Sequence, residues 1–530
     1  PRSLMGVIAA IRQTLLDAQH YDALAAANPP RRDPVLGFSE SLEALRLAIN
    51  RRQPVVFEPG SVLMADRATR LAGEFNLDFL LLASGQEWRR PDLMAVTGAR
   101  FIVPLSFPEL PKMPEESDWD QVELDQLRAW DWAAENPALL RSNRLEIALT
   151  TFALGDKKSF RKNLRLALDR GLSEADALAA LTTRPAEWSG VADQLGVIAP
   201  GRLANLTVVR GSYFDPEAQV SEVWIEGRNY PLTDPAAKPP EKAKADEKKS
   251  AEPPAARVAR SPLEERGPIL APPAVLFRNA TIWTSGPEGI LHGQDLLLAG
   301  GKVAGVGETG TVRLNAPDQL VEVDATGLHL TAGLIDAHNH SYILGSVNEG
   351  TLPSTAMVRI GDVVNSESPQ IYEQLAGGLT AASLLHGSAN PIGGQNAVVK
   401  LRWGAGPEEM IIADAPPGIK FALGENVKQS NWGENRRSRF PQTRMGVPVF
   451  MANRFTAAQQ YLAAWQRFAA GQGPQPRRDL ELETLGEIIE GKRLIHCHSY
   501  RQDEIVAFLR VMESFGVKVG TLQHILEGYK

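Results

Sequence analysis

Cysteine is almost absent from this chain, and so are other features that would narrow its class. The 530 residues contain one cysteine, Cys497, so no disulfide can form within the chain and the redox compartment cannot be read from cysteine usage. No apolar run approaches the roughly 18 residues of a membrane span. The net charge of −7 argues against a nucleic-acid-binding protein, whose domain is usually basic. Apolar residues at 43% nevertheless exclude wholesale disorder.

The chain also lacks an initiator methionine and a signal-peptide pattern, since it begins at Pro1. We therefore expect it to be the inner part of a longer protein, and its localisation is left open. A typical domain has roughly 100–200 residues. A chain of 530 residues is accordingly expected to contain two or more domains.

A segment rich in Pro, Ala, Lys and Glu divides the chain. It covers 231–273, includes KPPEKAKADEKKSAEPPAARVAR and has almost no bulky apolar residues. Such a segment cannot bury enough surface to offset its ordering entropy, so we predict a solvated linker, or near its ends an exposed strap on a domain surface. The linker separates 1–230 from 274–530.

The two pieces resemble each other at a shift of 440 residues. PRSLMGV at 1–7 pairs with PQTRMGV at 441–447, and the same ungapped register gives 17 identities in 90 positions. A repeat with so long a period indicates a tandem of large domains rather than a solenoid. We therefore interpret 1–230 as the back part of one copy and 274–530 as the front part of the next.

Helical and strand patterns alternate in both pieces. Four segments with helical periodicity are each followed by a short apolar run: 41–52 and 54–57, 65–76 and 77–83, 480–491 and 493–498, 501–516 and 517–524. This spacing is typical of parallel βαβ units. Strands broken by Gly-rich turns instead predict a small β-domain over 274–333, ahead of an α/β part over 334–530.

Histidines are concentrated in the second piece, and two of them stand close together in GLIDAHNH. His338 and His340 follow an apolar strand, and residues two apart in a strand point to the same face. Neutral imidazole is a common ligand of zinc and similar metals. The pair therefore predicts a metal site, the alternative being two surface histidines in a turn.

The fragment LTAGLIDAHNH, after a Gly-rich β-domain, resembles the first barrel strand of the metal-dependent amidohydrolase superfamily, most closely its imidazolonepropionase- and dipeptidase-like members. Further similar segments are GGLTAASLLHGSANPIGGQNAVVKLRWG (377–404), PPGIKFALGENVKQ (416–429), LIHCHS (494–499) and TLQHILEG (521–528), and 172–209 resembles the family's C-terminal passage. The resemblance implies an α/β fold, a (β/α)8 TIM barrel with an accompanying β-sandwich, here as two partial copies.

The resemblance also implies a metal centre at the ends of the barrel strands, holding one or two divalent ions such as zinc. His338 and His340 match the family's first-strand ligands, and His524 matches the sixth-strand ligand. His496 matches the fifth-strand ligand, although His498 shares its strand face and is the alternative.

The family usually adds a bridging acid, either a glutamate or a carboxylated lysine. Glu425 and Lys420 are the two candidates. Active sites of barrels lie where strands end, and Glu425 stands at that end whereas Lys420 lies one strand length earlier. We therefore favour Glu425 and keep Lys420 as the second choice.

Two residues after the second strand, His386 and Asn390, are candidate substrate contacts, with loop stabilisation as the alternative. The family's general base is an aspartate after strand eight, which we expect beyond residue 530. In the first copy, the 440-residue shift places Val56, Glu58 and Ser84 opposite His496, His498 and His524. The first copy is therefore predicted to be a degenerate barrel without a metal.

The activity that the resemblance implies is hydrolysis of a C–N bond by a metal-activated water. The substrate class is a small-molecule amide, cyclic amide or peptide-like compound, with no nucleic-acid partner. The alternative is a non-catalytic barrel scaffold or binding protein derived from an amidohydrolase. Whether the protein forms a homo-oligomer is left open.

Overall fold

The computed structural model describes residues 1–27, 37–113, 115–215, 218–232, 270–313, 320–429, 432–433 and 439–530. The chain divides into two compact units: unit 1 is Pro1–Asp17 with Pro268–Lys530, and unit 2 is Ala18–Gly267. Most of the predicted linker, 233–269, lies outside the described residues. No helix in the described ranges is long and apolar enough to cross a membrane.

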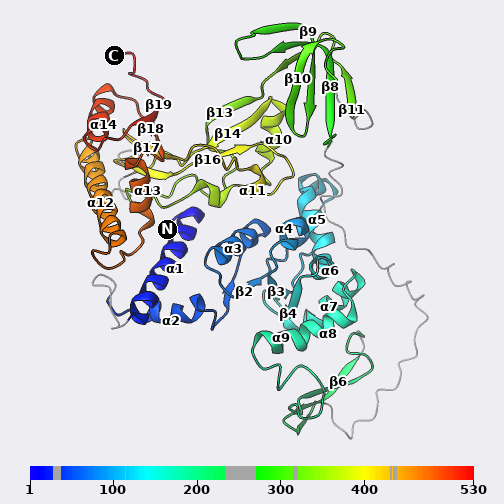
Figure 1. Ribbon diagram of the computed structural model, residues 1–530. Coiled ribbons are helices and arrows are strands. Elements are labelled where there is room, and N and C mark those ends of the chain that lie inside the picture. Colours follow the sequence, from blue (N-terminus) through cyan, green and yellow to red (C-terminus); the bar gives the residue numbers. More distant parts are fainter. Residues whose placement is uncertain are drawn as a thin grey trace. The chain divides into compact units, whose positions relative to one another are not determined.

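Unit 2 contains a parallel sheet in the order β1-β2-β3-β4 (Figure 1). Its strands are β1 (Val55–Phe57), β2 (Phe79–Leu82), β3 (Arg100–Pro104) and β4 (Glu146–Thr150). The helices before and between them are α2 (Glu40–Ile49), α3 (Val62–Glu74), α4 (Pro91–Ala95), α5 (Leu124–Trp132) and α6 (Asn136–Ser142). Leu81, Phe101 and Ile147 are buried in the core between sheet and helices. The alternation predicted from the sequence is therefore a parallel βαβ arrangement.

The rest of unit 2 is helical and then antiparallel. Three helices follow β4: α7 (Phe160–Asp169), α8 (Glu174–Leu181) and α9 (Thr183–Trp188). A three-stranded sheet comes next, formed by β5 (Leu206–Arg210), β6 (Gln219–Ile225) and β7 (Arg228–Pro231).

The second segment of unit 1, Pro268–Lys530, begins with the β-domain that the sequence predicts. The five strands are β8 (Ala274–Trp283), β9 (Ile290–Ala299), β10 (Lys302–Glu308), β11 (Leu320–Asp324) and β12 (His329–Thr331). They form one mixed sheet in which β8 pairs with β9, β11 and β12. Ala274, Leu276 and Leu297 form a small buried cluster on it. This sheet positions the start of the α/β part that carries the candidate site.

The α/β part of unit 1 contains two sheets. One has the order β13-β14-β16, with β13 (Leu334–Asn339), β14 (Leu379–Leu384) and β16 (Ala397–Lys400). The other has the order β15-β17-β18-β19, with β15 (Ile392–Gln395), β17 (Gly418–Ala422), β18 (Leu494–His498) and β19 (Val519–Gln523). Within the described residues, the strand pairings leave both sheets open rather than closed into a barrel.

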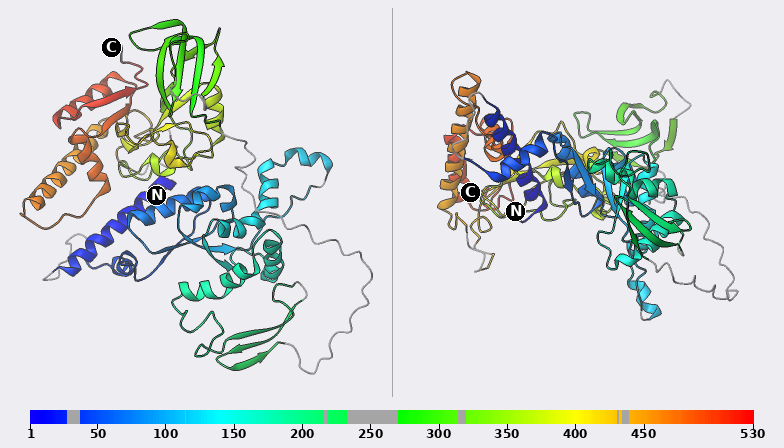
Figure 2. Two further views of the ribbon diagram at one scale, coloured as in Figure 1. Left: turned by 45° about the vertical axis from the view of Figure 1, so that its right-hand side comes forward. Right: turned by 90° about the horizontal axis from the view of Figure 1, so that it is seen from below.

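Helices cover these sheets. They are α10 (Pro369–Ala376), α11 (Pro407–Met410), α12 (Gly446–Ala469), α13 (Leu480–Ile489) and α14 (Gln502–Ser514). Figure 2 shows the last three, coloured orange to red, beside the strands β17 to β19. Phe421 of β17 lies against Phe455 of α12 and Phe508 of α14, with ring centroids 6.2 and 6.3 Å apart. This apolar layer fixes the strands whose ends carry the candidate ligands.

The first helix, α1 (Leu4–Ala26), gives its N-terminal part to unit 1. Met5, Ile8 and Ala9 are buried in a cluster with residues around Ile360. Arg12 donates two hydrogen bonds to Asp362, at 2.8 and 3.1 Å. Unit 2 therefore starts later than the predicted piece 1–230, because these contacts join residues about 350 positions apart, a separation that no local pattern reveals.

The elements repeat at the spacing found in the sequence. Helices α2 and α13 begin and end 440 residues apart, and so do α3 and α14. The strands β1 and β2 fall at the same shift within β18 and β19. The shared bounds agree with an internal repeat, while the tandem arrangement remains a prediction.

Helix α12 provides a test of which contacts stabilise unit 1. Phe455 is fully buried between two aromatic rings, whereas Val449 of the same helix is 64% exposed. Phe455→Ala should lower the free energy of unfolding by about 3–5 kcal/mol, because it removes a packed ring and leaves a cavity. Val449→Ala should change it by less than about 0.5 kcal/mol. Urea unfolding measures both, and similar losses in the two variants would contradict this core.

Candidate metal centre

Parallel pairing brings the ends of three strands of unit 1 to one edge of a sheet. Lys420 of β17 pairs with His496 of β18, and Ala422 pairs with His498. His498 in turn pairs with Gln523, the last residue of β19. Because the carboxyl ends of parallel strands meet, side chains from β17, β18 and the residue after β19 converge.

Four imidazoles form what we call the histidine cluster: His338, His340, His498 and His524. The ring centroids of His338 lie 4.8 Å from those of both His340 and His524, and His524 lies 4.6 Å from His498. Nε2 of His338 and Nε2 of His340 are 3.0 Å apart. His524 has a φ of +65°, a left-handed conformation that ends β19 abruptly. The structure thus brings together the predicted first-strand pair, the predicted sixth-strand residue and His498.

Lys420 extends into this cluster from β17. Its side chain is fully buried, and Nζ lies 3.3 Å from Nε2 of His338 and 3.0 Å from Oε1 of Gln523. Burial lowers the pKa of Lys420 to about 8. A neutral amine is therefore accessible at this position near physiological pH.

Burial makes the histidines poor bases. Burial, followed by the nearby charge of Lys420, lowers the pKa of His338 to about 3. Burial and the neighbouring His524 lower the pKa of His498 to about 4. Burial also lowers the pKa of His340 and of His524. The cluster is therefore neutral at pH 7, the form in which imidazole offers a lone pair to a metal.

The loop after β14 holds two of these rings. Nδ1 of His340 lies 2.8 Å from the carbonyl oxygen of Leu385, which fixes the proton on that nitrogen and leaves the Nε2 lone pair facing His338. Nδ1 of His498 lies 2.9 Å from Oγ of Ser388. Partners of this kind orient the ligands in metal sites.

Two predicted ligands lie apart from the cluster. Glu425 is about half exposed and forms ion pairs with Arg444 and with Lys428, the latter at 3.0 Å. His496 lies two residues before His498 on β18, further from the carboxyl end of the strand. Its Nδ1 lies 2.9 Å from Oγ1 of Thr521. Its ring covers Gly418, where a Cβ would come 2.6 Å from Nε2. The structure thus places Lys420 and His498 at the cluster and Glu425 and His496 apart from it, while the choice of ligand within each pair stays a prediction.

The two predicted substrate contacts are engaged with the protein itself. His386 is fully buried, with Nε2 accepting from the backbone N–H of Glu349 at 2.8 Å and Nδ1 lying 2.8 Å from the carbonyl oxygen of Gly387. Nδ2 of Asn390 donates to the carbonyl oxygen of Glu349 and to Oγ1 of Thr355, both at 2.6 Å. These contacts correspond to the alternative of loop stabilisation.

The donor set fits a divalent metal in part. Two nitrogens that bind one tetrahedral zinc at ~2.0–2.1 Å are about 3.4 Å apart, close to the observed separation of the two Nε2 atoms. Within the described residues, no three His, Cys, Asp or Glu side chains are already arranged around one point. The Nε2 atoms of His338 and His340, 3.0 Å apart, are the part of the site that matches metal chemistry.

The corresponding positions of unit 2 hold no such group. Val56 is 55% exposed on β1, and Glu58 is exposed in the loop that follows. Oγ of Ser84 donates to Oε1 of Glu87 at 2.8 Å, and Nδ2 of Asn136 donates to Oε2 of the same residue at 2.8 Å. These side chains close a turn after β2 through ordinary hydrogen bonds.

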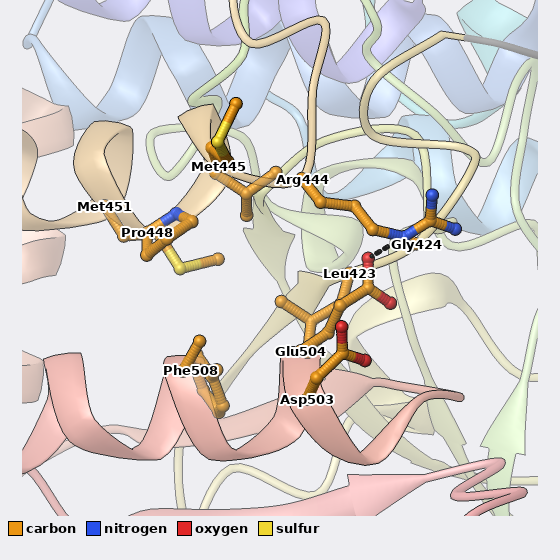
Figure 3. A pocket seen from close by; sticks show the side chains of 11 residues that line it. Leu423, Gly424, Arg444, Met445, Pro448, Met451, Asp503, Glu504 and Phe508 are labelled. Carbon is orange, nitrogen blue, oxygen red and sulfur yellow. Dashed lines mark ion pairs between the residues drawn. The ribbon is translucent and has the colours of Figure 1, made fainter.

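Figure 3 shows a pocket of about 210 Å3 on the helix side of β17. Met445, Pro448, Met451 and Phe508 lie around one end, and Arg444 faces Glu504 at the other. No member of the histidine cluster lines it. The pocket is therefore separate from the candidate metal centre.

Sequence reasoning missed several residues that touch the cluster. The ring of Tyr500 contacts that of His498 at a tilt, with ring centroids 4.6 Å apart, and Gln523 contacts Lys420. Tyr500 directly follows the segment 494–499, and Gln523 directly precedes His524. Their position in the sequence could therefore have marked them as neighbours of the site. Ser388 lies between the candidates His386 and Asn390, but its contact with His498 joins residues 110 positions apart, which no local pattern reveals.

Comparisons with known proteins give the following similarities. The profile of the Amidohydrolase family matches residues 139–230. A curated protein, Amidohydrolase tasK of Hapsidospora irregularis, is 27% identical over 286 residues, which is 47% of this chain and 29% of that protein. The chain thus spans under a third of the curated relative's length.

Two solved structures are also similar. An amidohydrolase from Thermotoga maritima MSB8 shares 33% sequence identity, with a TM-score of 0.43, over 48% of this chain and 65% of that one. A Xaa-Pro dipeptidase with bound methionine shares 16% identity, with a TM-score of 0.23, over 32% of this chain and 48% of that one. At these TM-scores neither structure adds an argument about the fold.

The profile match contains 172–209, the passage whose sequence resembles the family's C-terminal part. The curated relative extends the similarity to nearly half of the chain. Together these similarities support the amidohydrolase superfamily for the matched parts of this chain.

Proposed function

We propose that this chain is part of a metal-dependent hydrolase that cleaves a C–N bond in an amide, cyclic amide or peptide-like substrate. The similarity to amidohydrolases supports a hydrolase of mixed α/β, TIM-barrel type. The observation that carries the finer proposal is the convergence of the histidine cluster and Lys420 at one edge of strands. The proposed substrate is a small molecule.

The proposed ligands are His338 and His340, with His498 and His524 on the other side of the cluster. A bound divalent ion, zinc in the simplest case, would lower the pKa of a water and polarise the scissile carbonyl. The chain's own part is to keep His338 and His498 neutral by burial and to orient His340 and His498 through Leu385 and Ser388.

Lys420 is the proposed bridging group. It is the buried residue whose Nζ already faces His338, whereas Glu425 is paired with cations outside the cluster. Carboxylation of Lys420 would form a bond between Nζ and the carbon of CO2 and release one proton. The product is a carboxylate at the place where the family's bridging acid is needed.

A second role is favoured for unit 2. Its strand ends carry Val56, Glu58 and Ser84 in place of histidines, and Ser84 is bonded to Glu87. We propose that unit 2 serves packing or partner contact and binds no metal. The scaffold alternative thus applies to this half of the chain.

The first test removes a proposed ligand. His338→Ala should lower Co2+ affinity by at least about 100-fold. Even residues that only hydrogen-bond to a metal ligand change metal affinity by about 10–100-fold when they are replaced. His292→Ala, at an exposed histidine of β9, should leave the affinity unchanged. Visible absorption during Co2+ titration measures the affinity, and hydrolysis of a panel of dipeptides and N-acyl amino acids measures the activity. Equal Co2+ binding by both variants would contradict the site.

A second test separates the two candidates for the bridging group. Lys420→Gln should reduce hydrolysis by about 100-fold or more, since the variant keeps the length but cannot form a carbamate. Glu425→Gln should stay within about threefold of wild type, as expected for a half-exposed position. Initial rates at saturating metal give the comparison. The opposite ranking would restore Glu425 as the bridging acid.

A further inference from the structure

We propose that the start of α1 positions the candidate metal centre. It acts through the buried carboxylate of Glu349, which lies in the segment between β13 and α10, and this segment in turn holds the loop after β14. Glu349 is thus a positioning residue rather than a catalytic one. The inference rests on the proposed function only where it treats His340 and His498 as metal ligands. It is carried by an unbroken series of contacts within unit 1.

The series begins at the N-terminus of α1. Oε2 of Glu349 accepts hydrogen bonds from the backbone N–H groups of Arg2 and Ser3, at 2.8 and 2.9 Å, and from Oγ of Ser3 at 2.9 Å. The start of a helix has backbone N–H groups without partners in the helix, and a carboxylate there satisfies them and complements the helix dipole. Although burial favours the neutral acid, hydrogen bonds from Thr351, Arg2 and Ser3 lower the pKa of Glu349 to about 2.

The backbone of Glu349 continues the series into the loop after β14. Its N–H donates to Nε2 of His386 at 2.8 Å, and its carbonyl oxygen accepts from Nδ2 of Asn390 at 2.6 Å. The N–H of Gly387 donates to the carbonyl oxygen of Val347 at 2.8 Å. The segment that binds α1 therefore holds the loop at His386 and at Gly387 and Asn390, which follow it.

Packing leaves His386 little room to adjust. A Cβ on Gly393 would lie 2.9 Å from its Nδ1, and a Cβ on Gly394 would lie 3.0 Å from its Cδ2. The ring is fully buried between these glycines and Glu349. A shift of Glu349 must therefore move His386 and the backbone on either side of it.

That backbone orients two proposed ligands. The carbonyl oxygen of Leu385 holds Nδ1 of His340, and Oγ of Ser388 holds Nδ1 of His498. Leu385 and Ser388 flank His386 within the same short loop. Displacing the first turn of α1 would thus change the orientation of rings that it never touches.

The role is particular to α1 and is not shared by its repeat counterpart. Gly6 corresponds to Gly446 at the 440-residue shift. A Cβ on Gly6 would lie 2.1 Å from Oε2 of Glu349, whereas a Cβ on Gly446 would meet Pro441 and the ring of Phe440. The same helix start therefore faces a carboxylate in one copy and apolar side chains in the other.

The test perturbs the contact from each side. Glu349→Gln keeps the size of the side chain but replaces one acceptor oxygen with a donor. Gly6→Ala leaves Glu349 intact and places a methyl group against its carboxylate, although alanine favours helix over glycine. Glu373→Gln, at an exposed position of α10, and Gly73→Ala, where a Cβ meets nothing within 4 Å, are the matched controls.

Two readouts follow the loop and the metal separately. Amide hydrogen exchange in metal-free protein should become faster in 385–389 in Glu349→Gln and Gly6→Ala, and should stay at the wild-type rate in both controls. Co2+ affinity, from visible absorption, should fall by about 10–100-fold in the same two variants.

The outcomes distinguish this inference from the proposed function. If wild-type protein binds no Co2+, the proposed function fails, and the exchange rates in 385–389 still decide the positioning role. Wild-type exchange in 385–389 in both variants would overturn the inference. Faster exchange that also spreads over β8 and β9 would overturn it as well, because Glu349 would then stabilise unit 1 as a whole.

Discussion

Parallel pairing of β17, β18 and β19 is the constraint on which the candidate centre depends. A strand side chain points to the same face as the residue two positions away, so a shift by one residue would turn Lys420 and His498 to the opposite face. The buried rings of Phe421, Phe455 and Phe508 fix this register from the helix side. The apolar layer thus determines the chemistry at the strand ends, although none of its residues touches the cluster.

The sequence predicts well what local patterns encode. The alternation of helix and strand is observed, and the pair His338 and His340 lies in one cluster because a strand sets its spacing. Long-range geometry is less accessible. The sequence does not reveal that His498 rather than His496 contacts His524, or that Arg444 pairs with Glu425. The packing of α1 in unit 1 depends on contacts about 350 residues apart.

The same helices and strands recur in the two units at a shift of 440 residues, whereas the residues at their strand ends differ. Helices α2 and α13 keep the same bounds at the 440-residue shift, although Val56, Glu58 and Ser84 stand opposite His496, His498 and His524. Core packing needs only apolar residues of suitable size, whereas a metal site needs several donors at fixed positions. The layered structure of unit 2 therefore does not require histidines at these positions.

Strand β13 has a consequence for handling the chain in solution. It pairs with β14 along one edge, and among the described residues no strand pairs with its other edge. Leu334 and Ile335 on this strand are 56% and 72% exposed. Unpaired N–H and C=O groups beside exposed apolar side chains are a template on which other chains add as extra strands. Concentrated solutions are therefore expected to aggregate edge to edge, and a lysine at position 335 would act as a gatekeeper against this association.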